Sequence, residues 1–418
     1  MTAAPKALLE RLAPPGDGAA GRAGAWLEAN GLPTTKLEAW RYTPVDEIVA
    51  GLEDAVPAGP STVTLDVVDE LAGDHGGSRL VLVNGRPVPE LSRLDLLPGG
   101  VRVGTGAAAA GPADEVDEPI RYDGFQALNQ LGAPDAATIE VDAGARLEAP
   151  LQVVHLTVPD GSPIVAQPRT SIRLGEGSAA TVIETYAGLP GATITNATTI
   201  IDLEPGAALV HHRIQVESSE AVHVGHTRVR QAAESSLTSM SIMLGGVIAR
   251  HALDLVLAGE HARAELDGLY LLSGRQRHDN VVTVDHAASR CTTDQHFRGV
   301  MADQARGSFS GHVIVRAGTV RTDANQSNRN LLLDRSAQAD TRPWLEIFAD
   351  DVRCNHGATV GRLDDDALFY LRSRGIPLDD ARTILIGAFV NEITDVIEPV
   401  SLRDHLSGVI ALRMGAKP

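Results

Sequence analysis

The chain has 418 residues, 43% of them apolar, and its 36 basic and 54 acidic side chains give a net charge of −18. This length predicts two or three structural units. A surface this acidic repels phosphate groups, so we expect no binding to nucleic acid or to an anionic membrane surface. Aromatic residues make up only 3% of the chain, which argues against sugar-binding and single-stranded nucleic-acid surfaces, because both rely on aromatic platforms.

The cysteine content and the apolar runs indicate the compartment. Cys291 and Cys354 are the only two cysteines, too few for a disulfide framework, and we expect both to be reduced. The first residues lack the apolar run of a signal peptide. No stretch approaches the roughly 18 consecutive apolar residues of a membrane span. We therefore expect a cytoplasmic protein.

The N-terminal region begins with helical sequence. Residues 5–30 predict helix interrupted by a Pro-Pro-Gly break, with Gly31 and Pro33 as the stop signal. The next segment, KLEAWRYTPVDEI, has three large side chains that could anchor it to a core, namely Trp40, Tyr42 and Ile48.

Two further features complete this region. Asn84-Gly85, between two apolar runs, predicts a β-hairpin. Residues 104–120 are small, acidic and contain proline, which is typical of a loop or linker.

The central region, residues 137–362, is a series of short β-branched runs separated by small-residue corners. The corners fall at Gly144, Gly177, Gly206, Glu234 and His261, roughly 27–33 residues apart. Regular corners without helical periodicity indicate a β-solenoid or a double-sheet jelly roll. The drift in spacing leaves that choice open on periodicity alone.

The C-terminal region, residues 363–418, predicts three helices. Acidic residues from Asp364 begin the first, Gly375 ends it, and Pro377 precedes the second. The expected buried stripe of the second helix is Ala381, Ile384, Leu385, Ala388 and Val396. For the third helix, which begins at Ser401, it is Leu402, Leu406, Val409 and Ile410. We therefore expect three units: 1–136, 137–362 and 363–418.

Histidines crowd the strand region, and they suggest a metal-binding alternative. They are His211, His212, His223, His226, His251, His261, His278, His286, His296, His312 and His356. A cupin-like metalloenzyme would gather several of them on one metal inside a barrel. Exposed or stacked histidines on a solenoid face are the favoured interpretation, because adjacent residues such as His211 and His212 point to opposite faces of a strand.

Motifs of common enzyme classes do not occur in the sequence. We find no G-x-S-x-G, H-E-x-x-H or G-x-x-x-x-G-K-[ST], so there is no basis for a nucleophile elbow, a zinc protease or a phosphate-binding loop. If ATP is involved, it binds to another subunit. The acidic strand residues could form carboxylate pairs, but they have no fixed spacing and no aromatic subsites, which argues against a glycosidase. These residues are Asp254, Glu265, Asp267, Asp285 and Asp294.

Cys354 and His356 are the strongest candidate ligands. They lie two residues apart in DDVRCNHGATVG, so in a strand they share one face and could offer a thiolate and an imidazole to one iron atom. Two ligands do not complete a site, so the others would come from another chain. The alternative is structural, with Cys354 as a buried small apolar side chain and His356 in a turn.

Several segments, in order, resemble the SufB/SufD family of the SUF iron–sulfur cluster assembly system, and its SufD branch in particular. They are KLEAWRYTPVDEI, DGFQALNQ, QHFRGVMADQARGSFSGHVIV, NRNLLLDRSAQADTRPWLEI and LEIFADDVRCNHGATVGRLDDDALFYLRSRGI. The resemblance covers nearly the whole chain from about residue 30. It implies a mainly β protein with a right-handed parallel β-helix core flanked by N-terminal and C-terminal helical regions.

The resemblance also implies function and partners. Members of this branch are non-catalytic scaffold subunits that pair with SufB, and the C-terminal helices bind SufC, an ABC-type ATPase that hydrolyses the ATP. The nascent iron–sulfur cluster forms at the SufB–SufD interface, where the family's histidine and cysteine fall on His356 and Cys354. Asn355 replaces the serine of many relatives. A reduced flavin in the full complex and a homodimer of the isolated chain are further expectations.

Overall fold

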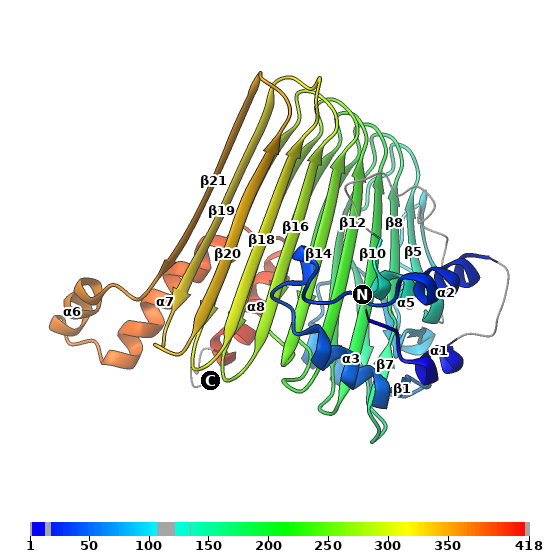
Figure 1. Ribbon diagram of the computed structural model, residues 1–418, viewed down its shortest axis with the longest axis horizontal. Helices are drawn as coiled ribbons and strands as arrows, with labels where there is room; N and C mark the ends of the chain where they lie inside the picture. Colours follow the sequence, from blue (N-terminus) through cyan, green and yellow to red (C-terminus); the bar gives the residue numbers. More distant parts are fainter. Residues whose placement is uncertain (1, 13–17, 107–121, 134, 414–418) are drawn as a thin grey trace.

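The protein is described here from a computed structural model that covers residues 2–12, 18–106, 122–133 and 135–413. Its centre is a parallel β-solenoid in which the chain winds between two long sheets (Figure 1). The β20 sheet has the strand order β20-β18-β16-β14-β12-β10-β8-β5-β4, and the β21 sheet has the order β21-β19-β17-β15-β13-β11-β9-β6-β2-β3. The predicted fold class is therefore confirmed.

The strands of the solenoid are mostly ten or so residues long. Their bounds are β5 Ala136–Val141, β6 Leu151–Thr157, β7 Ile164–Ala166, β8 Arg169–Leu174, β9 Ala179–Gly188, β10 Thr193–Leu203, β11 Ala208–Gln215, β12 Val222–Gln231, β13 Ser236–Met243, β14 Ile248–Leu257, β15 Arg263–Leu272, β16 Arg277–His286, β17 Thr292–Met301, β18 Arg306–Val315, β19 Thr322–Leu332, β20 Gln338–Ile347 and β21 Val352–Gly361. From β9 onward each strand pairs in parallel with the next strand but one along the chain, as Ile194 of β10 does with Val222 of β12. Parallel pairing distinguishes a solenoid from a jelly roll, whose strands are antiparallel.

The predicted corners form one edge of the solenoid. All five have positive φ: Gly144 (71°), Gly177 (63°), Gly206 (68°), Glu234 (59°) and His261 (62°). The backbone N–H of each donates to a carbonyl of the next turn, for example from Gly177 to Pro205 at 2.9 Å. The two following turns place Arg290 and Arg321 in the same conformation, and these two corners were not predicted. Hydrogen bonds between neighbouring turns therefore hold non-glycine residues at positive φ, a backbone conformation that they would otherwise avoid.

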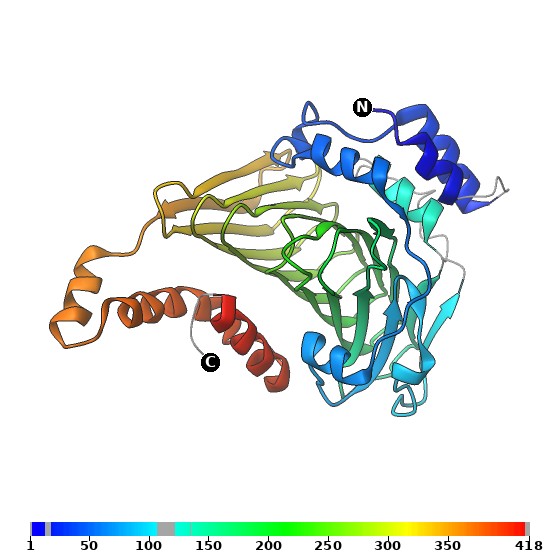
Figure 2. The same ribbon diagram turned by 90° about the horizontal axis from the view of Figure 1, so that it is seen from below.

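The solenoid interior is apolar along much of its length. Leu209, Leu255, Leu266 and Val284 are at most 2% exposed and belong to one continuous cluster between the two sheets. Inward and outward side chains alternate along each strand, as strand geometry requires. Many outward side chains are also buried, because helices from both ends of the chain cover parts of the outer faces (Figure 2).

The N-terminal region packs mainly on the β20 sheet. It comprises α1 Lys6–Leu12, α2 Ala19–Asn30, η1 Glu38–Trp40, α3 Val45–Asp54, β1 Val56–Pro57, α4 Leu65–Ala72, β2 Ser78–Val83, β3 Arg86–Pro87, η2 Pro89–Leu91, β4 Val101–Gly106 and α5 Gly124–Gly132. Trp40 and Ile48 are buried with Ile194 and Val224 of the sheet, which confirms them as anchors.

Strands of this region extend both sheets. β2 pairs in parallel with β6, and β4 pairs antiparallel with β5. β2 and β3 form the predicted hairpin, with φ of 52° at Asn84 and 76° at Gly85. Of the expected loop or linker over 104–120, residues 104–106 belong to β4 and residues 107–120 lie outside the described part of the chain.

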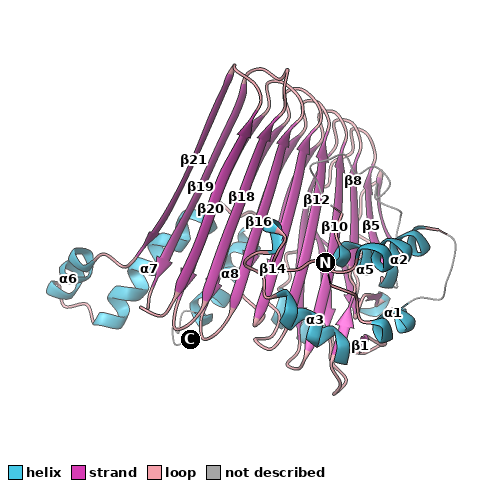
Figure 3. Cartoon of the chain, viewed as in Figure 1, coloured by secondary structure: helices cyan, strands magenta, loops and turns pink. Residues whose placement is uncertain are grey.

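Three C-terminal helices follow the last strand: α6 Asp365–Ser373, α7 Leu378–Thr394 and α8 Val400–Arg413 (Figure 3). Asp364 caps α6, because its carboxylate accepts from the backbone N–H groups of Asp366 and Ala367. α7 and α8 cover part of the outer face of the β21 sheet, where Leu406 lies with Ile214 and Leu269. No described helix is long and apolar enough to cross a bilayer.

The expected buried stripe of α7 is largely wrong. Ala381 is buried, but Ile384 is 49% exposed and Val396 66%. The side chains that pack on the sheet belong to the opposite face of the helix: Ile386, Val390 and Ile393. The helix is apolar on more than one face, so periodicity alone did not determine which face meets the sheet. The stripe of α8 is confirmed for Leu402, Leu406 and Ile410.

Candidate functional site

Cys354 and His356 lie on β21, the last strand of the β21 sheet. Their Cα partners on β19 are Ala324 and Gln326. β19 is the only strand with which β21 pairs within the described residues, so its other edge has no strand beside it. β20 occupies the corresponding last position of the opposite sheet. The candidate ligands are therefore on the final turn of the solenoid.

Both side chains are on the face of β21 that looks toward the solenoid interior. Cys354 packs against the interior apolar cluster and is partly buried. His356, two residues on, shares that face by strand geometry but is exposed. Gln326, the Cα partner of His356 on the neighbouring strand β19, is buried. The inward side chain at this position is thus buried on β19 but exposed on β21, because no further turn follows β21.

The electrostatics of Cys354 keep its sulfur protonated in the isolated chain. Burial raises the pKa of the thiol, and the negative charge of Asp323 adds to the effect. A thiol must lose its proton to bind a metal, so a metal ion at this position would have to displace that proton. The cysteine is thus less ready as a ligand than the exposed imidazole of His356.

A row of polar side chains holds β21 in register on the outer face. Asn355 donates from Nδ2 to Oδ1 of Asn325 at 3.1 Å, and Asn325 donates from Nδ2 to Oδ1 of Asp294 at 3.0 Å. The row runs across β17, β19 and β21. Asn355 therefore points away from Cys354 and His356, and its amide fixes the strand that carries them.

The last turn also exposes apolar side chains. Ile347 at the end of β20 is 41% exposed, the following Phe348 62%, and Val360 of β21 46%. Free strand edges offer unpaired N–H and C=O groups to another chain, and adjacent apolar side chains add burial on contact. We call β20, β21 and Phe348 the open end of the solenoid.

Most of the central histidines are buried, so the favoured expectation of exposed or stacked histidines is wrong for them. His155 and His211 both contact the carboxylate of Glu184, at 3.4 and 3.3 Å. Burial alone would raise the pKa of Glu184, but hydrogen bonds from these two histidines hold it well below its usual value. His223 contacts Glu217 in the same way, with 2.7 Å from Nδ1 to Oε2. These are polar pairs inside the solenoid.

The cupin-like arrangement is not what the described residues form. His211 and His212 do face opposite ways: Nε2 of His212 lies 2.7 Å from the backbone oxygen of Glu398, under the C-terminal helices. In the described part of the chain, the single group of at least three potential metal ligands contains only one histidine, His296. The sequence could not show the carboxylate partners of the buried histidines, because most come from a neighbouring turn of the solenoid, as Glu184 does for His211.

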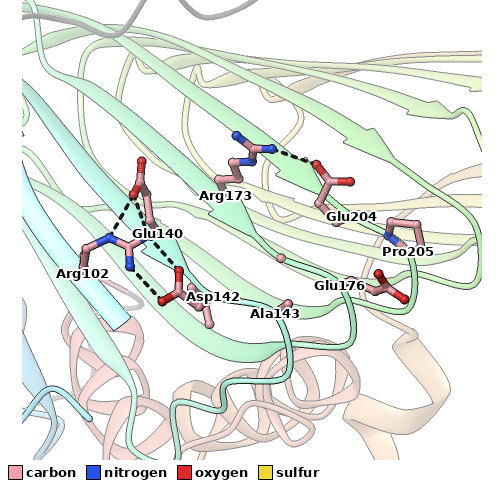
Figure 4. A pocket seen from close by; sticks show the side chains of 10 residues that line it. Arg102, Glu140, Asp142, Ala143, Arg173, Glu176, Glu204 and Pro205 are labelled. Atoms are coloured by element: carbon pink, nitrogen blue, oxygen red, sulfur yellow. Dashed lines mark hydrogen bonds and ion pairs between the residues drawn. The ribbon is translucent and has the colours of Figure 1, made fainter. Parts of the chain in front are cut away.

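A groove on the outer face of the β20 sheet is lined mainly by paired charges (Figure 4). Arg102 reaches Oε2 of Glu140 at 3.0 Å and Oδ2 of Asp142 at 2.9 Å, and Arg173 reaches Oε1 of Glu204 at 3.1 Å. Each of these arginines is already neutralised by carboxylates, so they do not make an anion site. The ion pairs link successive strands, which is a structural role.

Comparison with known families decides the assignment. Residues 157–389, more than half of the chain, match the family model described as "SUF system FeS cluster assembly, SufBD core domain". The chain belongs to the SufB/SufD family. Membership in the SufB/SufD family makes it a subunit of the SUF iron–sulfur cluster assembly system.

Relatives support the SufD branch of the SufB/SufD family. The iron–sulfur cluster assembly protein SufD of Escherichia coli is 34% identical, over 92% of this chain and 90% of the relative. The SufBD family protein slr0076 of Synechocystis is 33% identical, over 91% and 87%. Protein ABCI7 of Arabidopsis thaliana, described as chloroplastic, is 31% identical, over 90% and 82%. The resemblance inferred from the motifs is confirmed.

Proposed function

We propose that this chain is a non-catalytic scaffold subunit whose open end pairs with SufB and contributes His356 to a nascent iron–sulfur cluster at the shared interface. One observation carries the proposal. An exposed imidazole lies on the last strand of an open-ended solenoid, on the same strand face as a cysteine. The cluster is the cargo of this assembly step, and the chain alone offers too few ligands to retain it.

The incomplete ligand set supports a shared site. Iron–sulfur clusters are held mainly by thiolates, and this chain has two cysteines, of which Cys291 is buried. Cys354 is protonated and partly buried in the isolated chain. His356 is therefore the principal ligand from this side, Cys354 is secondary, and the remaining thiolates come from SufB.

The C-terminal helices are the proposed docking surface for SufC, the ATPase that supplies ATP hydrolysis. α6 has no buried residue, and it exposes Phe369 (74%) and Tyr370 (54%). Leu378 and Ile384 add exposed apolar surface on α7. The opposite face of α7 packs on the β21 sheet, so the docking face is the part that remains outside.

The decisive experiment is co-expression of the tagged chain with SufB and SufC, anaerobic purification, and measurement of iron and acid-labile sulfide. We expect His356→Ala to co-purify with both partners but to hold several-fold less iron and sulfide. Cys354→Ser should have a smaller effect. His261→Asn is the matched control, because His261 is exposed at a solenoid corner and asparagine tolerates its positive φ.

Normal cluster content in the His356→Ala complex would contradict the ligand assignment. The two interfaces are tested separately in the same system. Val360→Lys should weaken capture of SufB and leave SufC bound, whereas Phe369→Glu should weaken capture of SufC and leave SufB bound. Leu412→Glu, which alters another exposed apolar residue of the C-terminal helices, is the control. Loss of both partners in every variant would argue against two distinct surfaces.

Point substitutions test the proposed SufC surface better than a deletion from Asp364 onward would. α7 and α8 cover Ile214, Leu269 and other apolar side chains of the β21 sheet, and a deletion would expose them to water.

Three additional proposals are a homodimer of the isolated chain through the open end, a reduced flavin in the full complex and a cytoplasmic location. Size-exclusion chromatography of the Val360→Lys variant tests the homodimer.

A further inference from the structure

Three potential metal ligands converge on the outer face of the β21 sheet. They are Glu265 and Asp267 of β15 and His296 of β17. His296 and Asp267 are Cα partners on adjacent strands. Each of the three residues offers a ligand atom, and these atoms all lie within 4.8 Å of one another. A single ion could therefore contact all three.

Asp267 carries the argument, because it is a buried carboxylate to which no arginine or lysine of the described chain hydrogen-bonds. It is 6% exposed, and its Oδ1 lies 3.2 Å from Nδ1 of His296. Within the described chain no donor outside the three-residue group hydrogen-bonds to it. Two other buried aspartates have an arginine, Asp279 with Arg250 at 2.6 Å and Asp285 with Arg316 at 3.0 Å, whereas buried Asp254 has a histidine, His226, at 2.9 Å. A buried charge ordinarily needs such a partner.

The surroundings of the group add negative charge. Asp294 of β17 is the Cα partner of Glu265, so a third carboxylate lies beside the group. Arg298 is on the same strand as His296, but its guanidinium pairs with Glu392 of α7. The nearest guanidinium, that of Arg298, is thus shared with Glu392, and the group keeps more carboxylates than cations. A divalent ion would offset this negative charge.

We propose that Glu265, Asp267 and His296 bind one divalent transition-metal ion. A mixed set of carboxylate oxygens and one imidazole nitrogen suits Mn²⁺, Fe²⁺, Co²⁺ and Zn²⁺, whereas Mg²⁺ and Ca²⁺ prefer oxygen alone. Glu265 is exposed and the side chain of His296 is 48% exposed. The ion can therefore enter from solvent, and water can complete its coordination.

This site is distinct from the open end. Cys354 and His356 lie on the inward face of β21, whereas the three ligands lie on the outward face of β15 and β17, with β19 between them and β21. The proposal does not depend on the pairing with SufB. It also uses no cysteine, so it predicts a metal with oxygen and nitrogen ligands only.

The test is a titration of the purified full-length chain, free of SufB and SufC, with Co²⁺ under anaerobic conditions. Isothermal calorimetry gives stoichiometry and affinity, and the visible spectrum reports the ligands. We expect about one Co²⁺ per chain and no sulfur-to-cobalt charge-transfer band. Asp267→Asn and His296→Gln should each weaken binding by about tenfold or more. Thermal unfolding of each variant distinguishes the loss of a ligand from a loss of folding.

Matched controls make the result decisive. His261→Asn removes another exposed histidine, and Cys354→Ser with His356→Ala removes the ligands of the open end. All should bind Co²⁺ as the unaltered chain does. The proposal is overturned if no stoichiometric binding occurs, or if Asp267→Asn and His296→Gln bind as tightly as the unaltered chain. Binding that is lost only with Cys354 and His356 would also overturn it.

Discussion

Removing the carboxylate of Asp279 should destabilise the protein strongly, because that group anchors the N-terminal segment to the solenoid. Asp279 accepts hydrogen bonds from Nη1 of Arg250 at 2.6 Å, from Oγ1 of Thr43 at 2.5 Å and from Oγ of Ser308 at 2.6 Å. The guanidinium of Arg250 also stacks on the ring of Trp40, 3.9 Å from its centroid. The Trp40–Thr43 segment is thus fastened to one buried ion pair.

The magnitude follows from burial. The side chains of Arg250 and Asp279 are 2% and 5% exposed, so Asp279→Ala leaves a buried guanidinium without its counter-charge. Breaking one partner of a buried pair costs about 3–5 kcal/mol, a large part of the roughly 5–15 kcal/mol that stabilises a typical protein. Replacing both residues, as Arg250→Met with Asp279→Ala, should cost clearly less than the sum of the single changes.

The assay is urea unfolding followed by circular dichroism and by tryptophan fluorescence, since Trp40 reports on this contact. Glu204→Ala is the control, because its ion pair with Arg173 is exposed and should contribute at most about 1 kcal/mol. The reasoning is refuted if Asp279→Ala costs less than about 1 kcal/mol. It is also refuted if the two changes at Arg250 and Asp279 are additive.

Three further predictions concern the helices, the corners and pH. Leu406→Ala, at a fully buried position of α8, should cost about 2–5 kcal/mol and speed hydrogen exchange in α8. Gly206→Ala should cost about 1–2 kcal/mol in thermal unfolding because φ is 68°, whereas Gly357→Ala, with open space around it, should be neutral. Burial lowers the pKa of His75 and of His212 from 6.5 to about 4. The folded state then binds fewer protons than the unfolded state, so urea midpoints should fall as pH drops from 6.5 toward 4; a constant midpoint would contradict this.

The solenoid was predictable because its corners impose a local requirement. Positive φ favours glycine, so Gly144, Gly177 and Gly206 reveal the period directly. Arg290 and Arg321 adopt the same conformation without such a signal, because the turns stacked on them impose it. The choice between solenoid and jelly roll depends on parallel or antiparallel pairing. That is a long-range property, which the local sequence does not contain.

The buried histidines show where the sequence pattern fails. Both faces of many strands are covered, the inner by the opposite sheet and the outer by helices, so apolar and polar residues do not alternate cleanly along them. His211 belongs to β11, where nearly every residue is buried, and its partner Glu184 lies a full turn away on β9. The spacing of Cys354 and His356 correctly placed both on one face of a strand. It could not show that one would be partly buried and the other exposed.

The end of the solenoid supports the proposal that a partner subunit covers this position. Every earlier turn buries its inward side chains under the next turn, and repeat proteins ordinarily close their last turn with a polar cap. Here the C-terminal helices cover the outer face of the β21 sheet instead, while Phe348 and Val360 remain exposed at the open end. A second solenoid placed there would cover those side chains and the free strand edges together. In the proposed function, any ligands that complete a site at His356 would arrive with the surface that buries it, so cluster assembly would be coupled to subunit pairing.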